Sequence, residues 1–261
     1  MITHMDSCAL KGKRILLTRA SHQLDNIEKM VRACGAEPLL FPCLTLEANE
    51  AELEQGIALL PEFSDLLFTS ANGVLTLASY CHGQNLTLKA AVGNKRIAAV
   101  GEKTATALKA LDIAVDIIPE VASQDGLITA YASYGAPERL LFFRAEEGRD
   151  RLASELEKQG VTVKTVKGYR TVCPDDDASE TVAMLAAGQI DAVLLGSSKT
   201  ARHFLQRINS IELANRPVVV AISPLMADET EKLGLNVQVV AKSASFESML
   251  DDLTEYFESI S

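Results

Sequence analysis

An internal repeat limits what this 261-residue chain can fold into more than any other feature of its sequence. Residues 14–35 align without gaps with residues 139–160 at an offset of 125 (139 minus 14), and residues 99–123 echo residues 221–245 at an offset of 122 (221 minus 99). We label the repeated segments A (14–46) and A′ (139–171), and B (65–131) and B′ (191–253). Their order in the chain, A-B-A′-B′, predicts a structure built from two similar halves. The matched pairs are Arg14 with Arg139, Arg19 with Arg144, Ala20 with Ala145, Asp25 with Asp150, Gly35 with Gly160, Ala99 with Ala221, Ala105 with Ala227, Leu111 with Leu233, Val115 with Val237 and Ser123 with Ser245.

Each part of the repeat alternates short apolar runs with segments of helical spacing. Helices are expected between the runs, as at 21–33, where Ser21 would be the N-cap and Gly35 would end the helix. This alternation predicts an α/β fold with parallel sheets covered by helices on both faces and with right-handed crossovers. Strands are predicted at 13–18, 65–68, 95–100, 115–118, 139–145, 161–164, 191–195 and 218–222.

The repeat alone leaves two assemblies open. A could pack with B and A′ with B′, which gives tandem domains divided near Gly135. Alternatively, B packs with A′ and A with B′, which inserts one domain into the other. Irregular, proline-bearing segments at 41–46 and 168–175 bracket B plus A′. Because domain boundaries usually fall in such segments, the insertion is favoured.

Composition and charge argue against several classes of protein. The net charge is −10, whereas a nucleic-acid-binding protein needs a basic face. No run approaches the ~18 uncharged apolar residues of a membrane helix, and residues 1–10 are too short and polar for a signal peptide. The five cysteines form no CxxC motif, which favours reduced thiols and a cytoplasmic protein.

Four predicted strand-to-helix turns are rich in small and hydroxyl residues. In open α/β sheets ligands bind beyond the carboxyl ends of the strands, where helix N-termini offer unpaired N–H groups and a positive dipole end to carboxylate or phosphate. Each hydroxyl could instead only cap its helix. Four such turns facing one cleft favour an anion site. The turns are Thr69-Ser70-Ala71-Asn72, Gly101-Glu102-Lys103-Thr104, Gly196-Ser197-Ser198-Lys199 and Ser223-Pro224.

Basic side chains adjoin these turns. Arg19 and Arg144 occupy matched strand ends, and Arg149 lies at a predicted helix start. Arginine forks suit carboxylates, although each of these arginines could equally form a salt bridge in solvent. Lys103 and Lys199 lie within the turns and have the same two interpretations.

Tyr169 lies beside the second linker segment, and its neutral phenol could donate a proton or a hydrogen bond at pH 7. A lone tyrosine in a linker is more often structural. The four histidines have no ligand-like spacing, and we expect them to be core or surface residues. No Ser-His-Asp order, metal cluster, GxGxxG or GxxxxGK[ST] motif occurs.

A series of short motifs is more specific in its order and spacing than any one of its members. They are Leu17-Thr18-Arg19, Phe68-Thr69-Ser70-Ala71-Asn72-Gly73-Val74, Ala99-Val100-Gly101 with Thr104-Ala105, Ser123-Gln124-Asp125-Gly126-Leu127, Arg144 with Gly148-Arg149-Asp150, Tyr169-Arg170-Thr171, Gly196-Ser197-Ser198 and Ser245-Phe246. With these motifs the chain resembles the uroporphyrinogen-III synthase family across nearly its whole length.

The resemblance implies two flavodoxin-like domains, each a doubly wound parallel sheet, joined by a two-stranded linker with one domain inserted in the other. Combined with the segments above, it gives one domain of residues 1–42 plus 174–261, an inserted domain of residues 47–167, and linker strands at 43–46 and 168–173. It further implies a hydro-lyase of tetrapyrrole and haem biosynthesis. That enzyme cyclises hydroxymethylbilane to uroporphyrinogen III with loss of water and inversion of ring D, without metal or cofactor.

The same resemblance assigns residues. It implies that Tyr169 assists departure of the substrate hydroxyl and that the turns bind the substrate. One turn departs from the family, which often has Gly-Pro-Thr-Thr-Ala where this chain has residues 223–227, so side-chain hydrogen bonding is in doubt there. The expected substrate-binding residues are Arg19, Thr69, Ser70, Ala71, Gly101, Lys103, Thr104, Arg144, Arg149, Ser197, Ser198, Lys199 and Ser223.

For partners, we expect the linear tetrapyrrole polycarboxylate, no nucleic acid and no membrane. A monomer with a transient contact to hydroxymethylbilane synthase is also expected. Two other classes stay open at this point: a two-lobed binding protein for a small anion, and a sugar-transferring enzyme with two nucleotide-binding lobes.

Overall fold

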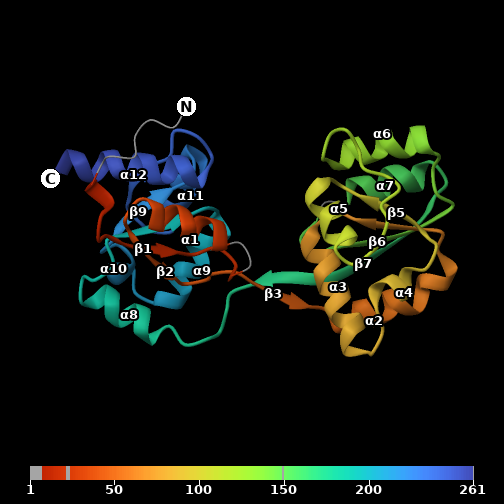
Figure 1. Ribbon diagram of the computed structural model, residues 1–261, viewed down its shortest axis with the longest axis horizontal. Coiled ribbons are helices and arrows are strands. Elements are labelled where there is room, and N and C mark those ends of the chain that lie inside the picture. The colour runs from red at the N-terminus through yellow and green to blue at the C-terminus, as the bar shows by residue number, and fades with distance from the viewer. Residues whose placement is uncertain (1–7, 22–23, 149, 261) are drawn as a thin grey trace. The chain divides into compact units, whose positions relative to one another are not determined.

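The computed structural model describes residues 8–21, 24–148 and 150–260, which divide into two compact units. Unit 1 consists of residues 1–45 and 172–261, and unit 2 of residues 46–171. The chain passes from one unit to the other within β3 (Thr45–Ala48) and back within β7 (Thr162–Val172) (Figure 1). These two strands are neighbours in the sheet of unit 2.

Unit 1 contains a five-stranded parallel sheet in the order β10-β9-β8-β1-β2. This is the flavodoxin-like order 2-1-3-4-5, in which the strand order reverses between β1 and β8. The strands are β1 (Arg14–Leu17), β2 (Glu37–Leu40), β8 (Ala192–Leu195), β9 (Val218–Ala221) and β10 (Val237–Val240). The helices are η1 (Cys8–Leu10), α1 (Leu24–Ala33), α8 (Ser179–Ala186), α9 (Ser198–Ile208), α10 (Ile211–Ala214), α11 (Pro224–Glu231) and α12 (Phe246–Ile260).

Unit 2 repeats four strands of this arrangement in the sheet order β3-β7-β6-β4-β5, in which β3 is added beside β7. Here β6 and β7 correspond to β1 and β2, and β4 and β5 correspond to β8 and β9, so the strand order reverses between β6 and β4. The remaining strands are β4 (Asp65–Phe68), β5 (Arg96–Ala99) and β6 (Arg139–Ala145). The helices are α2 (Glu50–Leu59), η3 (Leu60–Glu62), α3 (Ala71–Gly83), α4 (Leu88–Val92), α5 (Glu102–Lys109), α6 (Gln124–Tyr134) and α7 (Arg151–Lys158).

Helix ends confirm the repeat at residue level. Gly35 and Gly160 follow α1 and α7 with φ of +77° and +86°, a conformation that favours glycine. In both cases the next residue donates its N–H back into the last turn, from Ala36 to Val31 and from Val161 to Leu156. Both glycines therefore end their helices in the same way.

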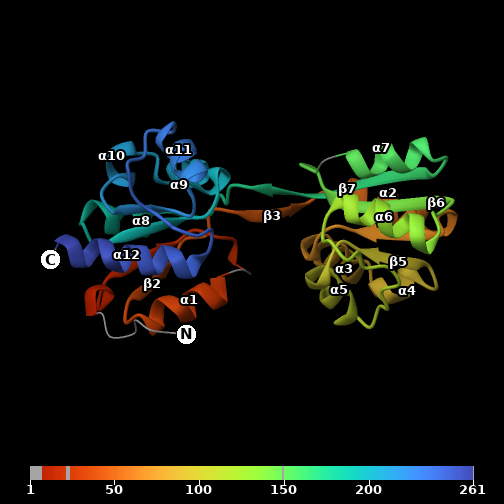
Figure 2. The ribbon, with the colours of Figure 1, turned by 90° about the horizontal axis from the view of Figure 1, so that it is seen from above.

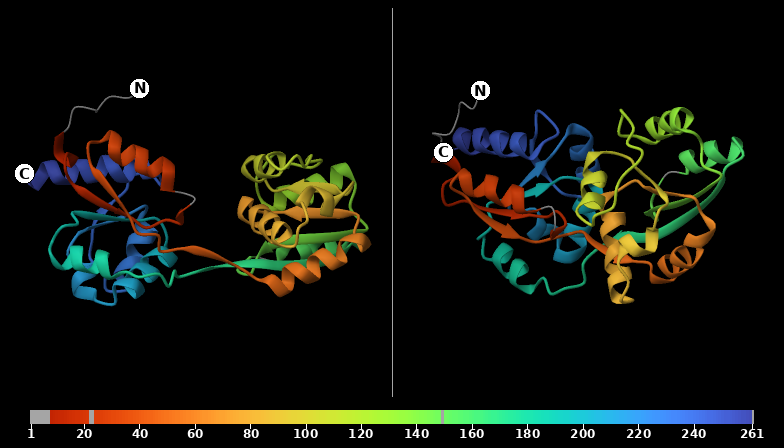
Figure 3. Two further views of the ribbon diagram at one scale, coloured as in Figure 1. Left: turned by 60° about the horizontal axis from the view of Figure 1, so that its bottom comes forward. Right: turned by 45° about the vertical axis from the view of Figure 1, so that its right-hand side comes forward.

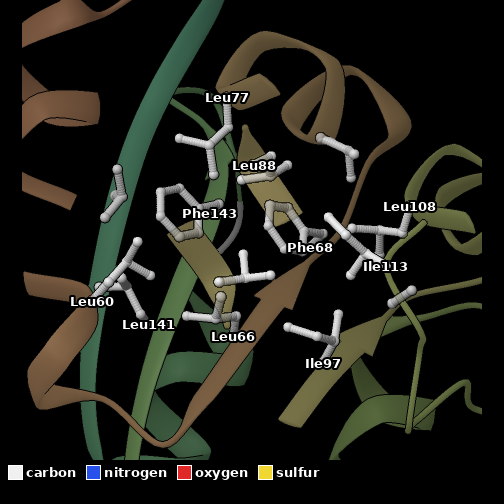
Figure 4. Packing of buried hydrophobic residues seen from close by; sticks show 14 of the residues in the cluster. Leu60, Leu66, Phe68, Leu77, Leu88, Ile97, Leu108, Ile113, Leu141 and Phe143 are labelled. Carbon is white, nitrogen blue, oxygen red and sulfur yellow. The ribbon is translucent and has the colours of Figure 1, made fainter. Parts of the chain in front are cut away.

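Alternating side chains of each sheet form two cores. In unit 2, Leu66 and Phe68 pack under α2, α3 and α5, whereas Leu67 packs with α6 and α7 on the opposite face. Figure 4 shows the first of these cores, where the rings of Phe68 and Phe143 stack with their centroids 5.4 Å apart. Both faces of the sheet are therefore buried, as predicted for a doubly wound fold.

Unit 1 likewise buries both faces of its sheet. Ile15 and Leu17 face α1 and α12, and Leu16 faces the helices α8–α11 on the other side of the sheet (Figure 2). Figure 3 shows α12 in blue and α1 in red on one face in both of its views, and the two helices are in contact.

The predicted strand at 115–118 is reduced to a single bridge between Ile117 and Ala98. At this point the Asp116 carboxylate accepts the N–H of Ile97 at 2.7 Å, so that amide donates to a side chain and not to a neighbouring strand. In unit 1 the Gln238 amide oxygen accepts the N–H of Val219 at 2.8 Å, and the register shifts beside it. Asp116 and Gln238 differ by the repeat offset of 122 (238 minus 116), and so do Ile97 and Val219 (219 minus 97). The side chain that takes a strand amide therefore occurs at the same position in both units.

Candidate functional site

The turns predicted to bind an anion lie at the carboxyl ends of parallel strands. In three of them a serine with extended backbone is the N-cap, with φ/ψ of −155°/141° at Ser70, −163°/156° at Ser197 and −164°/162° at Ser223. Each hydroxyl accepts an N–H of its own helix, at 3.1, 3.1 and 3.3 Å respectively. The serine hydroxyls therefore cap α3, α9 and α11, and other first-turn amides lack a partner within the helix.

The fourth turn, at the start of α5, has no side-chain cap. Gly101 is its N-cap, and a Cβ there would lie 3.0 Å from the Cβ of Ala122, so the position has little room for a side chain. Thr104 is buried in the first turn of α5, and Lys103 beside it is exposed. The amides at this helix start thus have no side-chain acceptor from the N-cap.

Tyr169 lies against the first turn of α3 within unit 2. Its side chain is buried, and a Cβ on Gly73 would lie 3.4 Å from its ring. Burial raises the pKa of the phenol above its usual value, a hydrogen bond with the Ser70 hydroxyl acts in the opposite direction, and the Glu147 carboxylate raises it further. The phenol is therefore in its neutral, proton-donating form at pH 7.

Thr69 and Ala71, which flank Ser70, are both partly exposed. Ser70, between them, joins this turn to Tyr169 through its hydroxyl in unit 2. In unit 1, Ser197, Ser198 and Lys199 form the start of α9.

Arg144 is buried, with 3% of its side chain exposed, and it holds the loop that follows β6. Its guanidinium donates to the carbonyl of Gly148, to the carbonyl of Ala145 at 3.1 Å and to the carboxylate of Asp150 at 2.8 Å. The structure thus gives this arginine partners within its own unit. Arg149, in the same loop, lies outside the described residues.

Arg19, the repeat partner of Arg144, has a different environment in unit 1. It is partly exposed, and its guanidinium lies 5.3 Å from the ring centroid of Phe246. Thr18 beside it is buried and donates its hydroxyl to the Leu194 carbonyl at 2.6 Å, which joins the ends of β1 and β8. The reversal of strand order in unit 1 therefore lies between Arg19 and the turn that begins α9.

Two residues with a role at these turns were not predicted from the sequence. Gln124 accepts the N–H of Leu152 at 3.1 Å and so caps the start of α7 from the neighbouring helix. Phe246, at the start of α12, lies with its ring under the guanidinium of Arg19. Both belong to the short family-like motifs of the sequence, but the contacts join segments far apart in the chain, and spacing carries no signal for such contacts.

Fold and turns together define a protein of two doubly wound α/β units whose strand ends lead into amide-rich helix starts. The model of the family described as Uroporphyrinogen-III synthase HemD matches residues 25–251. By that match the chain belongs to the uroporphyrinogen-III synthase family. Its activity is the cyclisation of hydroxymethylbilane to uroporphyrinogen III with loss of water, a hydro-lyase reaction of tetrapyrrole biosynthesis.

Individual relatives agree with this assignment. The chain is 29% identical over 250 residues to the uroporphyrinogen-III synthase of Synechococcus elongatus, covering 92% of this chain and 94% of the relative. It is 23% identical over 230 residues to that of Chlorobaculum parvum, covering 87% and 92%. The solved uroporphyrinogen-III synthetase from Helicobacter pylori 26695 has the same fold, with a TM-score of 0.61 at 18% identity over 94% of this chain and 99% of that chain.

The family resemblance, the fold class and the activity predicted from the sequence are confirmed. The alternative classes, a two-lobed anion receptor and a sugar-transferring enzyme, are not supported. Among the residues that the structure describes, no helix is long and apolar enough to span a membrane.

Proposed function

We propose that first-turn amides of α3, α5, α9 and α11 bind the carboxylates of hydroxymethylbilane and that Tyr169 assists departure of its hydroxyl. The observation that carries the proposal is the geometry shared by four turns, in which an extended N-cap ends a parallel strand and starts a helix. The substrate carries acetate and propionate groups, and amides with a helix dipole can bind them although the protein has a net charge of −10.

In this proposal the serine hydroxyls act as caps and the backbone supplies the donors. The turn at Ser223, which lacks the usual hydroxyl residues after its proline, keeps the same cap geometry as the turn at Ser197. Positive side chains add to the attraction. They are Arg19, Lys103, Lys199 and, outside the described residues, Arg149. Arg144 contributes by fixing the loop after β6.

The reaction needs more positioning than acid catalysis. The nitrogen of the terminal pyrrole pushes out the hydroxyl, the Tyr169 phenol supplies the proton with which it leaves as water, and a protonated azafulvene remains beside the phenolate. Ring closure through a spiro intermediate inverts ring D, and the proton lost as the product becomes aromatic returns to the phenolate. Because the free bilane also closes without inversion, holding its ends in one geometry decides the isomer.

Replacing Ser198 with proline tests the backbone part of the proposal. Proline is favoured at the first position of a helix and removes only an N–H that the helix does not use. The residue before it must be extended, as Ser197 is, and α11 already has this arrangement with Ser223 followed by Pro224. We expect a KM for hydroxymethylbilane about 10-fold higher, because a hydrogen bond to a charged group contributes roughly 1.5–3 kcal/mol.

Ser198→Ala is the matched control, since it removes the same hydroxyl and keeps the amide. It should leave KM within about 2-fold of the original value if the backbone does the binding. Both variants should unfold at nearly the temperature of the parent protein. A normal KM in folded Ser198→Pro would show that this amide does not bind the substrate.

We further propose that the protein is a cytoplasmic monomer that receives hydroxymethylbilane through a transient contact with hydroxymethylbilane synthase. Spontaneous closure of the free bilane favours such a transfer, and Cys34, Cys43, Cys81 and Cys173 are free thiols. Sedimentation velocity should give a single species near the 28.1 kDa chain mass. A stable dimer at micromolar concentration would contradict the monomer.

A further inference from the structure

One aromatic ring lies beside residues that follow β1 and β8, the two strands between which the strand order of unit 1 reverses. Phe246, the first residue of α12, lies with its ring centroid 5.3 Å from the guanidinium carbon of Arg19, which follows β1. A Cβ on Gly196, which follows β8, would lie 3.1 Å from the Cζ atom of Phe246. The ring edge therefore rests on the backbone immediately before Ser197, the N-cap of α9.

This contact affects how Arg19 can bind an anion. The face of an aromatic ring attracts a guanidinium and shields one side of it from water. Burial lowers the pKa of Arg19 from its usual value, but an arginine stays protonated at neutral pH. A cation that is already held in place loses less conformational freedom when a ligand binds, so its contribution to affinity increases.

We propose that Phe246 is a positioning residue that holds the guanidinium of Arg19 beside the start of α9, where the cation and the helix amides bind one carboxylate of the substrate. The inference rests on the proposed function, which assigns Arg19 and α9 to substrate binding. This role of Phe246 also gives a reason for the glycine at position 196, because a side chain there would displace the ring of Phe246.

The same helix offers a matched control. Phe257, near the other end of α12, lies under a second cation, with the Nζ atom of Lys13 4.7 Å from its ring centroid. Lys13 precedes β1, so this pair lies at the amino end of the strand, away from the turns at its carboxyl end. Replacement of either phenylalanine by leucine removes an aromatic face and keeps an apolar side chain in the core that α12 shares with β1.

Steady-state kinetics with freshly prepared hydroxymethylbilane tests the proposal. We expect Phe246→Leu to raise KM about 5-fold with kcat within about 2-fold, and Phe246→Tyr, which retains a ring face, to keep KM near normal. Phe257→Leu should leave both constants unchanged at a comparable loss of thermal stability. Arg19→Met should raise KM about 10-fold, and adding Phe246→Leu to it should change KM no further, because the two side chains act as one unit.

The outcomes separate this inference from the proposed function. The positioning role of Phe246 is wrong if Arg19→Met raises KM and Phe246→Leu does not. It is also wrong if Phe246→Leu raises KM by the same factor in the Arg19→Met background as in the parent protein. In both cases the binding role of Arg19 stands. If Arg19→Met leaves KM unchanged, Arg19 does not bind the substrate, and both the assignment of Arg19 and the inference built on it are wrong.

Discussion

Replacing Tyr169 with phenylalanine should lower kcat for uroporphyrinogen III formation about 100-fold and leave the protein folded. General acid catalysis contributes roughly 10²–10⁴-fold, and we expect the low end because the pyrrole nitrogen itself drives the hydroxyl out. The variant also loses the hydrogen bond between the phenol and Ser70, which contributes about 1 kcal/mol to stability. Product analysis should show a larger share of the isomer that forms without inversion of ring D, since uncatalysed closure competes with the slowed reaction.

Tyr131 provides the matched control in the same unit. It is buried, and its hydroxyl finds no hydrogen-bond partner among the described residues. Tyr131→Phe therefore removes a buried phenol oxygen without breaking a hydrogen bond, and neither kcat nor the unfolding temperature should fall. Full activity of Tyr169→Phe, or an equal loss in Tyr131→Phe, would remove the acid role of Tyr169.

The pH dependence gives an independent check on Tyr169. Its neutral form is the active one, so activity should be lost as pH rises through the pKa of the phenol. Burial, as the largest cause, places that pKa above the usual value of about 10. We therefore expect no fall in kcat between about pH 7 and 9 that depends on Tyr169. A fall in this range that disappears in Tyr169→Phe would show that the pKa is lowered, contrary to the structure.

The alternation of strands and helices could be predicted because burial of both sheet faces requires continuous apolar runs such as residues 66–68 and 192–195. The helix starts at Ser70 and Ser197 could be predicted for a local reason, since a cap and its amide lie two or three residues apart. The repeat then indicated which strands correspond, and the structure confirms this in the two sheet orders.

Contacts between distant segments could not be predicted in the same way. Arg19 and Arg144 match in the sequence, yet one lies partly exposed over Phe246 and the other is buried among the carbonyls of its own loop. Their different environments depend on the loop after each strand and on the helix that packs there. The carboxylate of Asp116 similarly accepts the N–H of Ile97, a contact between separate segments that no local pattern reports.

Gly126→Ala should strongly destabilise unit 2. An added Cβ would lie 2.0 Å from the carbonyl oxygen of Val121, closer than any real contact, and 3.3 Å from Pro119. The obstacle is a backbone atom, so no side-chain rotation relieves it. The same carbonyl accepts the N–H of Ser123 at 2.7 Å, which fixes it against the first turn of α6.

Relief of this clash requires the first turn of α6 to move, and that turn is tied to α7. Gln124 caps α7 through Leu152, and Asp125 pairs with Arg151 at 3.2 Å. We therefore expect the free energy of unfolding to fall by about 3 kcal/mol, which lowers Tm by roughly 6–12 °C for a chain of this size. Activity should fall at temperatures where the parent is still stable, because α7 follows the loop that Arg144 holds.

Gly83→Ala is the control that separates steric overlap from a general effect of replacing glycine. Gly83 ends α3, and a Cβ there would meet no heavy atom within 4 Å. Alanine restricts the unfolded chain and favours helix, so this variant should be unchanged or more stable by up to about 1 kcal/mol. Thermal unfolding followed by circular dichroism measures both. If Gly126→Ala unfolds at the same temperature as Gly83→Ala, the close packing of residues 119–122 on α6 does not constrain unit 2, and the motif from Ser123 to Leu127 must have another physical reason.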